Sequence, residues 1–444
     1  MQGVGSQKTA DLPRTLGLPD AVAIVVGIVI GGGIFIVPNL VARNLGTSTA
    51  ILGVWIFGGV VTFFGALAAA ELGAAMPATG GQYVYLREIY GPLGGFLYGW
   101  SMFLVCRTAQ AAWLATTLAL YVSYFVPLGP VGSRLLEAGA LILLTAINYR
   151  GVYLSALVQK FLASAKVVGL LVIIGSAFLL RARVPAMPST AAAPFSMSHF
   201  GLALMACVLA YDGWAQMTDV AGEIKRPQRT ILAALVFGVG IVIIVYVLAN
   251  AAYLHLLSPA EIAASDHVGA TAAERVLGPA GGGLVAFIIV LSIIGSLNGV
   301  FMTGPRIYFA QARNGLFFSK FAEIHPRFQT PAFAIVAQAV WSMVLLLTGT
   351  YETLVTYAIP AAWFFYALMV LGVMLLRAKR PDLPRPYRMW GYPFTPLLFL
   401  IVAVAFIANS MIEQPGPTLA AFGLIAAGVP VFFLWGHRRD RQRA

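Results

Sequence analysis

Long apolar stretches dominate this chain and constrain its fold more than any other feature. About twelve of them reach the roughly 20 residues that a helix needs to cross a bilayer. Because they are continuous and lack the strict alternation of barrel strands, they predict helices. The sequence therefore predicts an all-α integral membrane protein with about 12 transmembrane helices. The stretches lie near 18–42, 50–75, 93–126, 134–149, 154–180, 200–221, 231–254, 283–310, 332–348, 353–376, 394–412 and 418–435.

The composition excludes a water-soluble fold. Of the 444 residues, 60% are hydrophobic and only 10% are charged, whereas soluble domains have about 25% charged residues. An enzyme would need converging nucleophiles, bases or metal ligands, and the sequence presents none. No lysine follows a glycine, so there is no phosphate-binding loop. We expect no catalytic residues, no metal and no cofactor.

The basic residues are distributed unevenly between the two sides of the membrane. If the chain crosses at each stretch, 21 of the 28 Lys and Arg residues fall on the side of the N-terminus. Five fall on the other side, and Arg107 and Lys166 lie within spans. This asymmetry predicts that both termini are cytoplasmic. The basic residues do not form a stripe interleaved with aromatic residues, so we expect no nucleic-acid partner.

Three consecutive glycines, Gly31, Gly32 and Gly33, interrupt the first span. Each costs a helix about 1 kcal/mol relative to alanine, so the cluster predicts a break. Broken backbone at membrane depth is tolerated where it lines a cavity, and the N-terminus of the second half-helix suits a carboxylate. We therefore take the glycines and Val29 as candidate substrate-binding residues. Close helix packing is the alternative, since Gly27 and Gly31 form a small-xxx-small pair.

The sixth span carries a second expected break, at Leu209-Ala210-Tyr211-Asp212-Gly213-Trp214. A carboxylate in the middle of a membrane usually faces the interior of the helix bundle. Together with free backbone carbonyls it could attract an ammonium group. Alternatively, Asp212 could cap the second half-helix through backbone N–H groups. We take Leu209, Ala210, Asp212 and Trp214 as candidate substrate-binding residues.

Lys166 lies six residues beyond Lys160, hence about 9 Å deeper along a helix. A buried ammonium there needs carbonyls or hydroxyls around it. Ser292 and Ser296 share one helix face and could supply hydroxyls, which predicts a coupling group of Lys166, Ser292 and Ser296. A lysine that snorkels back to the interface is the alternative.

Three further features carry smaller predictions. The sequence assigns no task to Arg107, and Glu71 is expected to have a structural role near the cytoplasmic basic loops.

Capping boxes at Ser258–Glu261 and Thr271–Glu274 predict two short helices over the outer face, between residues 255 and 282. A plain connector with helical turns is the alternative for this segment.

A series of motifs, in order along nearly the whole chain, resembles the amino acid–polyamine–organocation superfamily. The similarity is closest to bacterial homologues of the L-type amino acid transporter family. The motifs that carry it are Val26–Phe35, Glu71–Gly73, Gly80–Tyr83, Tyr90–Gly91, Ala210–Trp214, Gly295–Gly299, Ile324–Pro326, Arg380–Leu383 and Gly428–Phe433.

The resemblance implies a leucine-transporter-type fold of two inverted five-helix repeats with discontinuous helices 1 and 6. In this arrangement helices 1–5 span residues 18–180, an external linker covers 181–199, and helices 6–10 span 200–376. Helices 11–12 follow in 377–435, between cytoplasmic tails at 1–17 and 436–444.

The same resemblance implies a sodium-independent carrier that binds amino acids between the two broken helices and works by alternating access. Lys166 matches the family lysine that stands near the sodium position of related carriers. We expect an exchanger of neutral L-amino acids. A proton-coupled symporter, resting on Asp212 or Lys166, and a carrier of cationic amino acids or polyamines remain the alternatives.

Two departures from the family pattern affect these expectations. Gly32 stands where family members often have serine, which removes a possible hydroxyl contact. Eukaryotic light chains carry a cysteine between spans three and four that links them to a heavy chain, whereas residues 125–133 contain none. We therefore expect a stand-alone, monomeric carrier in the plasma (inner) membrane, with membrane lipid and a small-molecule substrate as its partners.

The predicted topology can be tested by accessibility labelling. A cysteine placed at Ser189 should react with an impermeant reagent from outside, and one placed at Gln442 should react only from inside. The reverse pattern would overturn the assignment of the termini to the cytoplasm.

Overall fold

The computed structural model describes residues 12–179 and 196–443. Their regular secondary structure is helical, apart from one isolated bridge between Leu16 and Ile224. Ten helices are long and apolar enough to cross a membrane, or eleven if the bent pair α1–α2 counts as one span, and α13 is a shorter apolar helix. These elements match the predicted stretches one for one, which confirms the all-α membrane fold. The helices are α1 (Leu18–Val29), α2 (Gly33–Asn44), α3 (Ser48–Ala75), α4 (Gln82–Ser101), η1 (Met102–Cys106), α5 (Arg107–Val122), α6 (Pro130–Tyr149), α7 (Val152–Leu179), α8 (Met197–Ala210), η2 (Trp214–Glu223), α9 (Pro227–Leu256), α10 (Pro259–Ala264), α11 (Val268–Leu277), α12 (Pro279–Arg313), η3 (Ser319–Ala322), α13 (Ala332–Thr348), α14 (Tyr351–Lys379), α15 (Phe394–Glu413) and α16 (Pro415–Arg443).

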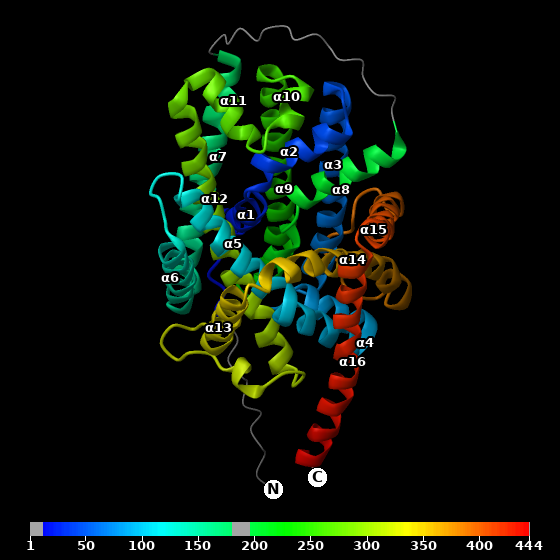
Figure 1. Ribbon diagram of the computed structural model, residues 1–444. Helices are drawn as coiled ribbons and strands as arrows, with labels where there is room; N and C mark the ends of the chain where they lie inside the picture. The colour runs from blue at the N-terminus through cyan, green and yellow to red at the C-terminus, as the bar shows by residue number, and fades with distance from the viewer. Residues whose placement is uncertain (1–11, 180–195, 444) are drawn as a thin grey trace.

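The helices form one bundle around α1 and α12 (Figure 1). The apolar window of α12 is 72% buried, whereas those of α6 and α16 are 17% and 22% buried, so α12 is central and the other two are peripheral. α1 packs against α7, α9 and α12, and α3 packs against α9. The short helices α10 and α11 lie at one end of the bundle, and α16 ends at the other (Figure 1).

Both predicted breaks are present. α1 ends at Val29 and α2 begins at Gly33, with a bend of 46° between them. In the sixth span α8 ends at Ala210, and Gly213 adopts a φ of 108°, a left-handed value that favours glycine. The span continues as the 3₁₀ helix η2. Because α2 packs on α8 and α1 packs on η2, the two breaks lie side by side.

The third span starts earlier than predicted. α4 begins at Gln82, eleven residues before the expected start at 93, and it is interrupted at Gly91, whose φ is 84°. A π-helical turn then joins it to α5. Polar residues such as Arg87 and Glu88, which form an ion pair, hide this first half from a hydropathy pattern.

The segment between residues 255 and 282 contains two short helices, but only one begins where its capping box predicts. The Ser258 hydroxyl accepts from the Glu261 N–H at 3.2 Å, and the Glu261 carboxylate accepts from the Ser258 N–H at 2.7 Å. That backbone bond and Arg275 hold the pKa of Glu261 below its usual value. The second box is wrong: α11 begins at Val268, and Thr271 lies inside it, donating to the His267 carbonyl. The predicted linker, 181–199, falls outside the described residues up to 195.

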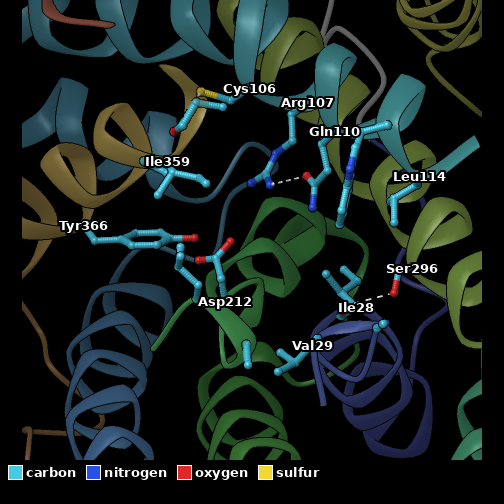
Figure 2. A pocket seen from close by; sticks show the side chains of 18 of the residues that line it. Ile28, Val29, Cys106, Arg107, Gln110, Leu114, Asp212, Ser296, Ile359 and Tyr366 are labelled. Carbon is cyan, nitrogen blue, oxygen red and sulfur yellow. Dashed lines mark hydrogen bonds between the residues drawn. The ribbon is translucent and has the colours of Figure 1, made fainter. Parts of the chain in front are cut away.

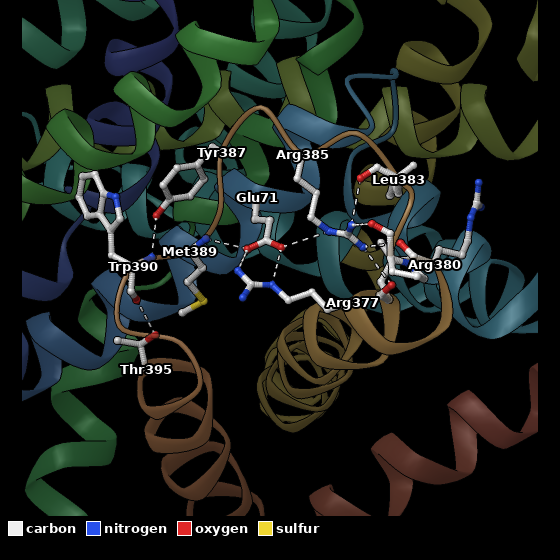
Figure 3. Close-up of polar contacts among 11 residues, drawn as sticks. Glu71, Arg377, Arg380, Leu383, Arg385, Tyr387, Met389, Trp390 and Thr395 are labelled. Carbon is white, nitrogen blue, oxygen red and sulfur yellow. Dashed lines mark hydrogen bonds and ion pairs between the residues drawn. The ribbon is translucent and has the colours of Figure 1, made fainter.

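Glu71 has the structural role that the sequence predicts (Figure 3). Its carboxylate accepts from the Arg377 guanidinium at 2.9 and 2.5 Å and from the Met389 N–H at 2.7 Å. Arg385 adds an ion-pair contact at 3.6 Å. This carboxylate therefore ties α3 to the end of α14 and to the loop before α15.

Candidate functional site

A cavity of about 330 Å³ lies where the two interrupted spans meet (Figure 2). Its volume falls in the range of small-molecule sites. Two other hollows, of about 410 and 590 Å³, include neither break in their linings. The structure brings seven of the eight predicted substrate-binding residues to the cavity, namely Val29, Gly31, Gly32, Gly33, Leu209, Ala210 and Asp212.

Trp214 is the exception and corrects the prediction. Its side chain is 3% exposed and does not line the cavity. The indole packs against Tyr366 at a ring distance of 5.2 Å and against Phe399 at 6.4 Å. Since Tyr366 does line the cavity, Trp214 supports the wall from behind.

The glycines of the first span divide between the two roles that the sequence left open. A Cβ on Gly27 would collide with the Gln159 side chain of α7, so Gly27 allows close packing. A Cβ on Gly32 would meet no protein atom within 4 Å, and a Cβ on Gly33 would lie 3.3 Å from Ala210. Gly32 therefore leaves free space beside the N-terminus of α2, where the first N–H groups have no carbonyl one turn back in the helix.

The carbonyl groups freed at the end of α1 are satisfied by Lys166, which is 0% exposed. Its ammonium donates to the carbonyls of Gly27 at 2.8 Å, Ile30 at 2.6 Å and Ser292 at 3.0 Å. This geometry excludes the snorkelling alternative. The prediction of serine hydroxyls around Lys166 is wrong, because Ser292 contributes its carbonyl and the Ser296 hydroxyl donates to the Gly27 and Ile28 carbonyls instead.

Tyr246 of α9 joins the two breaks directly, and sequence reasoning missed it. Its buried hydroxyl can donate to the Val29 carbonyl of α1 at 2.9 Å and to the Ala210 carbonyl of α8 at 3.2 Å. Tyr246 is one of two tyrosines in the most apolar of the spans. Its depth in the span was the available signal, but depth alone does not identify a hydrogen-bond partner.

Asp212 faces the cavity with one oxygen unpartnered. The Tyr366 hydroxyl faces its carboxylate (Figure 2). The Gly213 N–H also lies close to the carboxylate, whereas Oδ1 has no hydrogen-bond partner. Both roles that the sequence left open therefore have a structural basis. One oxygen is held near the start of η2, and the other is available to a ligand.

Arg107, which received no task from the sequence, lies in the cavity wall beside Gln110 (Figure 2). Its guanidinium lies 3.5 Å from the Gln110 amide oxygen and 3.6 Å from the carboxylate of Asp219. Gln82 and Tyr98 also line the cavity. Sequence reasoning did not find these residues because they lie on helices that only the tertiary fold brings together.

Comparison with known proteins decides the family. The family described as amino acid permease matches residues 16–435. The chain belongs to the amino acid permease family. It is 31% identical over 437 residues to the b(0,+)-type amino acid transporter 1 of Mus musculus, covering 96% of this chain and 89% of the relative. It is 34% identical over 452 residues to the Large neutral amino acids transporter small subunit 2 of Homo sapiens, covering 96% and 82%. This permease thus aligns with its relatives along almost its whole length.

The role of Lys166 in this permease can be tested by its effect on stability. Lys166→Ala removes the ammonium that donates to the Ile30 carbonyl and leaves the Gly27 carbonyl only the Ser296 hydroxyl at 3.3 Å. Each unsatisfied buried group costs about 1–3 kcal/mol. We expect a clear fall in the melting temperature of the purified protein in detergent. Lys160→Ala is the control, since its half-exposed pair with Asp20 contributes about 0–1 kcal/mol. Equal melting temperatures for the two variants would contradict the bracing role.

Proposed function

We propose that this protein is a sodium-independent amino acid transporter that works by alternating access and exchanges neutral L-amino acids. The observation that carries the proposal is the meeting of two helix breaks at one cavity. A protein with this arrangement offers opposite partial charges within the reach of one zwitterion. The names of its relatives, which include amino acid transporters of the b(0,+) type and of large neutral amino acids, support the same class of substrate.

The cavity provides a place for each charged group of an amino acid. The N-terminus of α2 carries partial positive charge and unpaired N–H groups, which suit the carboxylate. The C-terminal ends of α1 and α8 carry partial negative charge, which suits the ammonium group. Gly32 lets the carboxylate approach the backbone closely, because no side chain stands between them.

Lys166 supports the proposal of sodium independence. A cation that is covalently part of the protein already occupies the space between α1 and α12 and satisfies three carbonyl groups. A sodium ion would need oxygen ligands of the same kind. The resident ammonium therefore removes the need for a bound ion to stabilise this break.

Contacts just before α1 and at the end of η2 support alternating access, because they tie the two broken spans to each other and to α12. Leu16 exchanges backbone hydrogen bonds with Glu223 and Lys225, at 2.9 and 2.8 Å. Glu223 also forms an ion pair with Arg306, at 2.8 Å, with both side chains 0% exposed. A step that opens the cavity to the cytoplasm would have to separate these contacts.

The unpartnered oxygen of Asp212 favours a second candidate, a carrier that also accepts cationic amino acids. A side-chain ammonium or guanidinium would pair with that oxygen. Proton symport is the other alternative for the coupling mechanism. Binding measurements with a neutral and a cationic amino acid separate the two substrate classes.

We also propose that the protein acts alone in the plasma (inner) membrane, with both termini cytoplasmic. The excess of basic residues on the side of the termini supports this orientation. Its two cysteines, Cys106 and Cys207, are both buried and free, so neither is placed for a disulfide to a second chain. The boundaries of the two inverted repeats, 18–180 and 200–376, remain part of the proposal.

The carboxylate site can be tested at Gly32. Gly32→Val places a branched side chain in the free space beside the N-terminus of α2, so it should abolish amino acid binding while the protein stays folded and monodisperse. Capping the substrate carboxylate as an amide should likewise abolish binding to the wild type, since it removes the charge that the helix terminus attracts. Thermal-shift and direct binding assays measure both effects.

Gly240→Val is the matched control, because a Cβ at Gly240 of α9 also meets no protein atom within 4 Å but lies outside the cavity. It should bind as the wild type does. Gly33→Val should differ from both by losing stability, since its side chain would press on Ala210. Tight binding of the amide, or wild-type binding by Gly32→Val, would refute the carboxylate site.

The transport mode can be tested in liposomes that contain only the purified protein. We expect rapid uptake of a labelled neutral amino acid when unlabelled amino acid is present inside, slow uptake when it is absent, and no effect of sodium. Lys166→Ala should slow this exchange severely. Uptake that rises steeply with sodium, or that is equally fast into empty liposomes, would contradict the proposed mechanism.

A further inference from the structure

A buried carboxylate that the proposed function does not use lies beside the cavity. Asp219 of η2 is 0% exposed and faces the Arg107 guanidinium at 3.6 Å, and that guanidinium is itself almost fully buried. Because Arg107 lines the cavity, the Asp219 carboxylate is one side chain away from any bound substrate.

The polar groups around this pair lack partners. Neither oxygen of Asp219 has a hydrogen-bond partner of good geometry, and neither do the Arg107 Nε, the Tyr98 hydroxyl and both amide atoms of Gln82. All four side chains are more than nine-tenths buried. Buried polar groups are nearly always hydrogen-bonded, so a cluster of this kind indicates a place for small polar species such as water and protons.

The charges near the cavity do not balance. The Arg107 guanidinium is the cation that faces both Asp219 and Asp212. The Lys166 ammonium is held by three carbonyls and does not line the cavity, so these two carboxylates share one guanidinium. Leaving a charge uncompensated in a buried site costs several kcal/mol. A neutral amino acid displaces water from the cavity, which raises the free-energy cost of the uncompensated carboxylate. Because the amino acid carries no net charge, it does not offset this cost.

No other charged group compensates Asp219 within the part of the chain that the structure describes. The groups that face it are Arg107 and the hydroxyls of Tyr85, Tyr98 and Tyr308, with the Cys106 thiol beside the latter two. The charged residues of the neighbouring helices are engaged elsewhere or exposed: Asp20 pairs with Lys160, Glu71 with Arg377 and Arg306 with Glu223, and Arg229 is exposed.

We propose that Asp219 is a proton-binding site that takes up a proton when a neutral amino acid fills the cavity. The proton comes from the aqueous phase, binds a carboxylate oxygen and cancels the excess negative charge. A cationic amino acid supplies the compensating charge itself, through Asp212, and needs no proton. This inference rests on the proposed function, and it gives that function a link to pH that Lys166 and Asp212 do not supply.

The competing interpretation is purely structural. The backbone N–H of Gln82, the first residue of α4, also faces the Asp219 carboxylate, so Asp219 could serve only to hold the start of that helix. A permanently ionised cap would bind no proton with substrate. The two interpretations therefore differ in a quantity that can be measured directly.

The test is calorimetric binding of leucine and of lysine to the purified protein near pH 7, in buffers of different ionisation enthalpy. The dependence of the observed enthalpy on the buffer gives the number of protons taken up per ligand bound. For leucine we expect on the order of one proton, and for lysine, if it binds, close to none. A value near zero for leucine would overturn the proposal.

Variants then assign the proton to its site. Asp219→Asn should reduce the leucine value to near zero, whereas Asp219→Glu, which keeps a carboxylate, should retain it. Glu137→Gln is the matched control, since Glu137 is a buried carboxylate paired with Arg134 on the peripheral helix α6. It should leave the value unchanged.

A proton number that survives in Asp219→Asn would also overturn the proposal. If Asp219→Asn does not fold, the wild-type comparison of leucine with lysine still decides, because equal proton numbers for the two ligands would exclude the charge-compensation argument. Failure of the proposed function would look different, since neither amino acid would then bind at all.

Discussion

The structure depends on how the backbone groups freed at two helix breaks are satisfied inside a membrane. A bilayer offers no water to these groups, so each must find a partner in the protein or in a ligand. At the end of α1 the partners are built in: Lys166 satisfies the carbonyls of Gly27 and Ile30, and Tyr246 satisfies that of Val29. At the start of α2 the N–H groups are left facing a cavity. These free N–H groups are where the carboxylate of a ligand can bind.

The sequence predicted the parts of this arrangement that local chemistry determines. Consecutive glycines cannot sustain a helix, and a charged residue deep in an apolar span must face the interior, so both breaks and the burial of Lys166 were accessible from the sequence. Contacts between distant segments were not accessible. Tyr246, Arg107 and Asp219 act through partners on other helices. The hydrophobic periodicity of a single helix does not identify such partners.

The errors in the sequence-based prediction have physical causes as well. Trp214 was expected in the cavity as part of the second helix break, but it follows the left-handed Gly213 and its indole packs against Tyr366 behind the cavity wall. The Ser292 hydroxyl was expected to accept from Lys166, but Lys166 donates to the Ser292 backbone carbonyl instead. In both cases the residue lies close to the predicted place, and the local backbone geometry decides which of its atoms is presented.

The same unsatisfied groups give a physical reason for the proposed exchange of amino acids. The carbonyls of α1 keep their partners whether or not substrate is present, because Lys166 and Tyr246 belong to the protein. The first N–H groups of α2 have no carbonyl one turn back in the helix, and Asp212 Oδ1 has no hydrogen-bond partner. An empty carrier can hydrate these groups while the cavity is wet, but a closed intermediate between the two faces excludes water. Each group left unpaired there costs about 1–3 kcal/mol, and a bound amino acid removes that cost. The empty carrier therefore meets a higher barrier than the loaded one, which is the property that the proposed exchange requires.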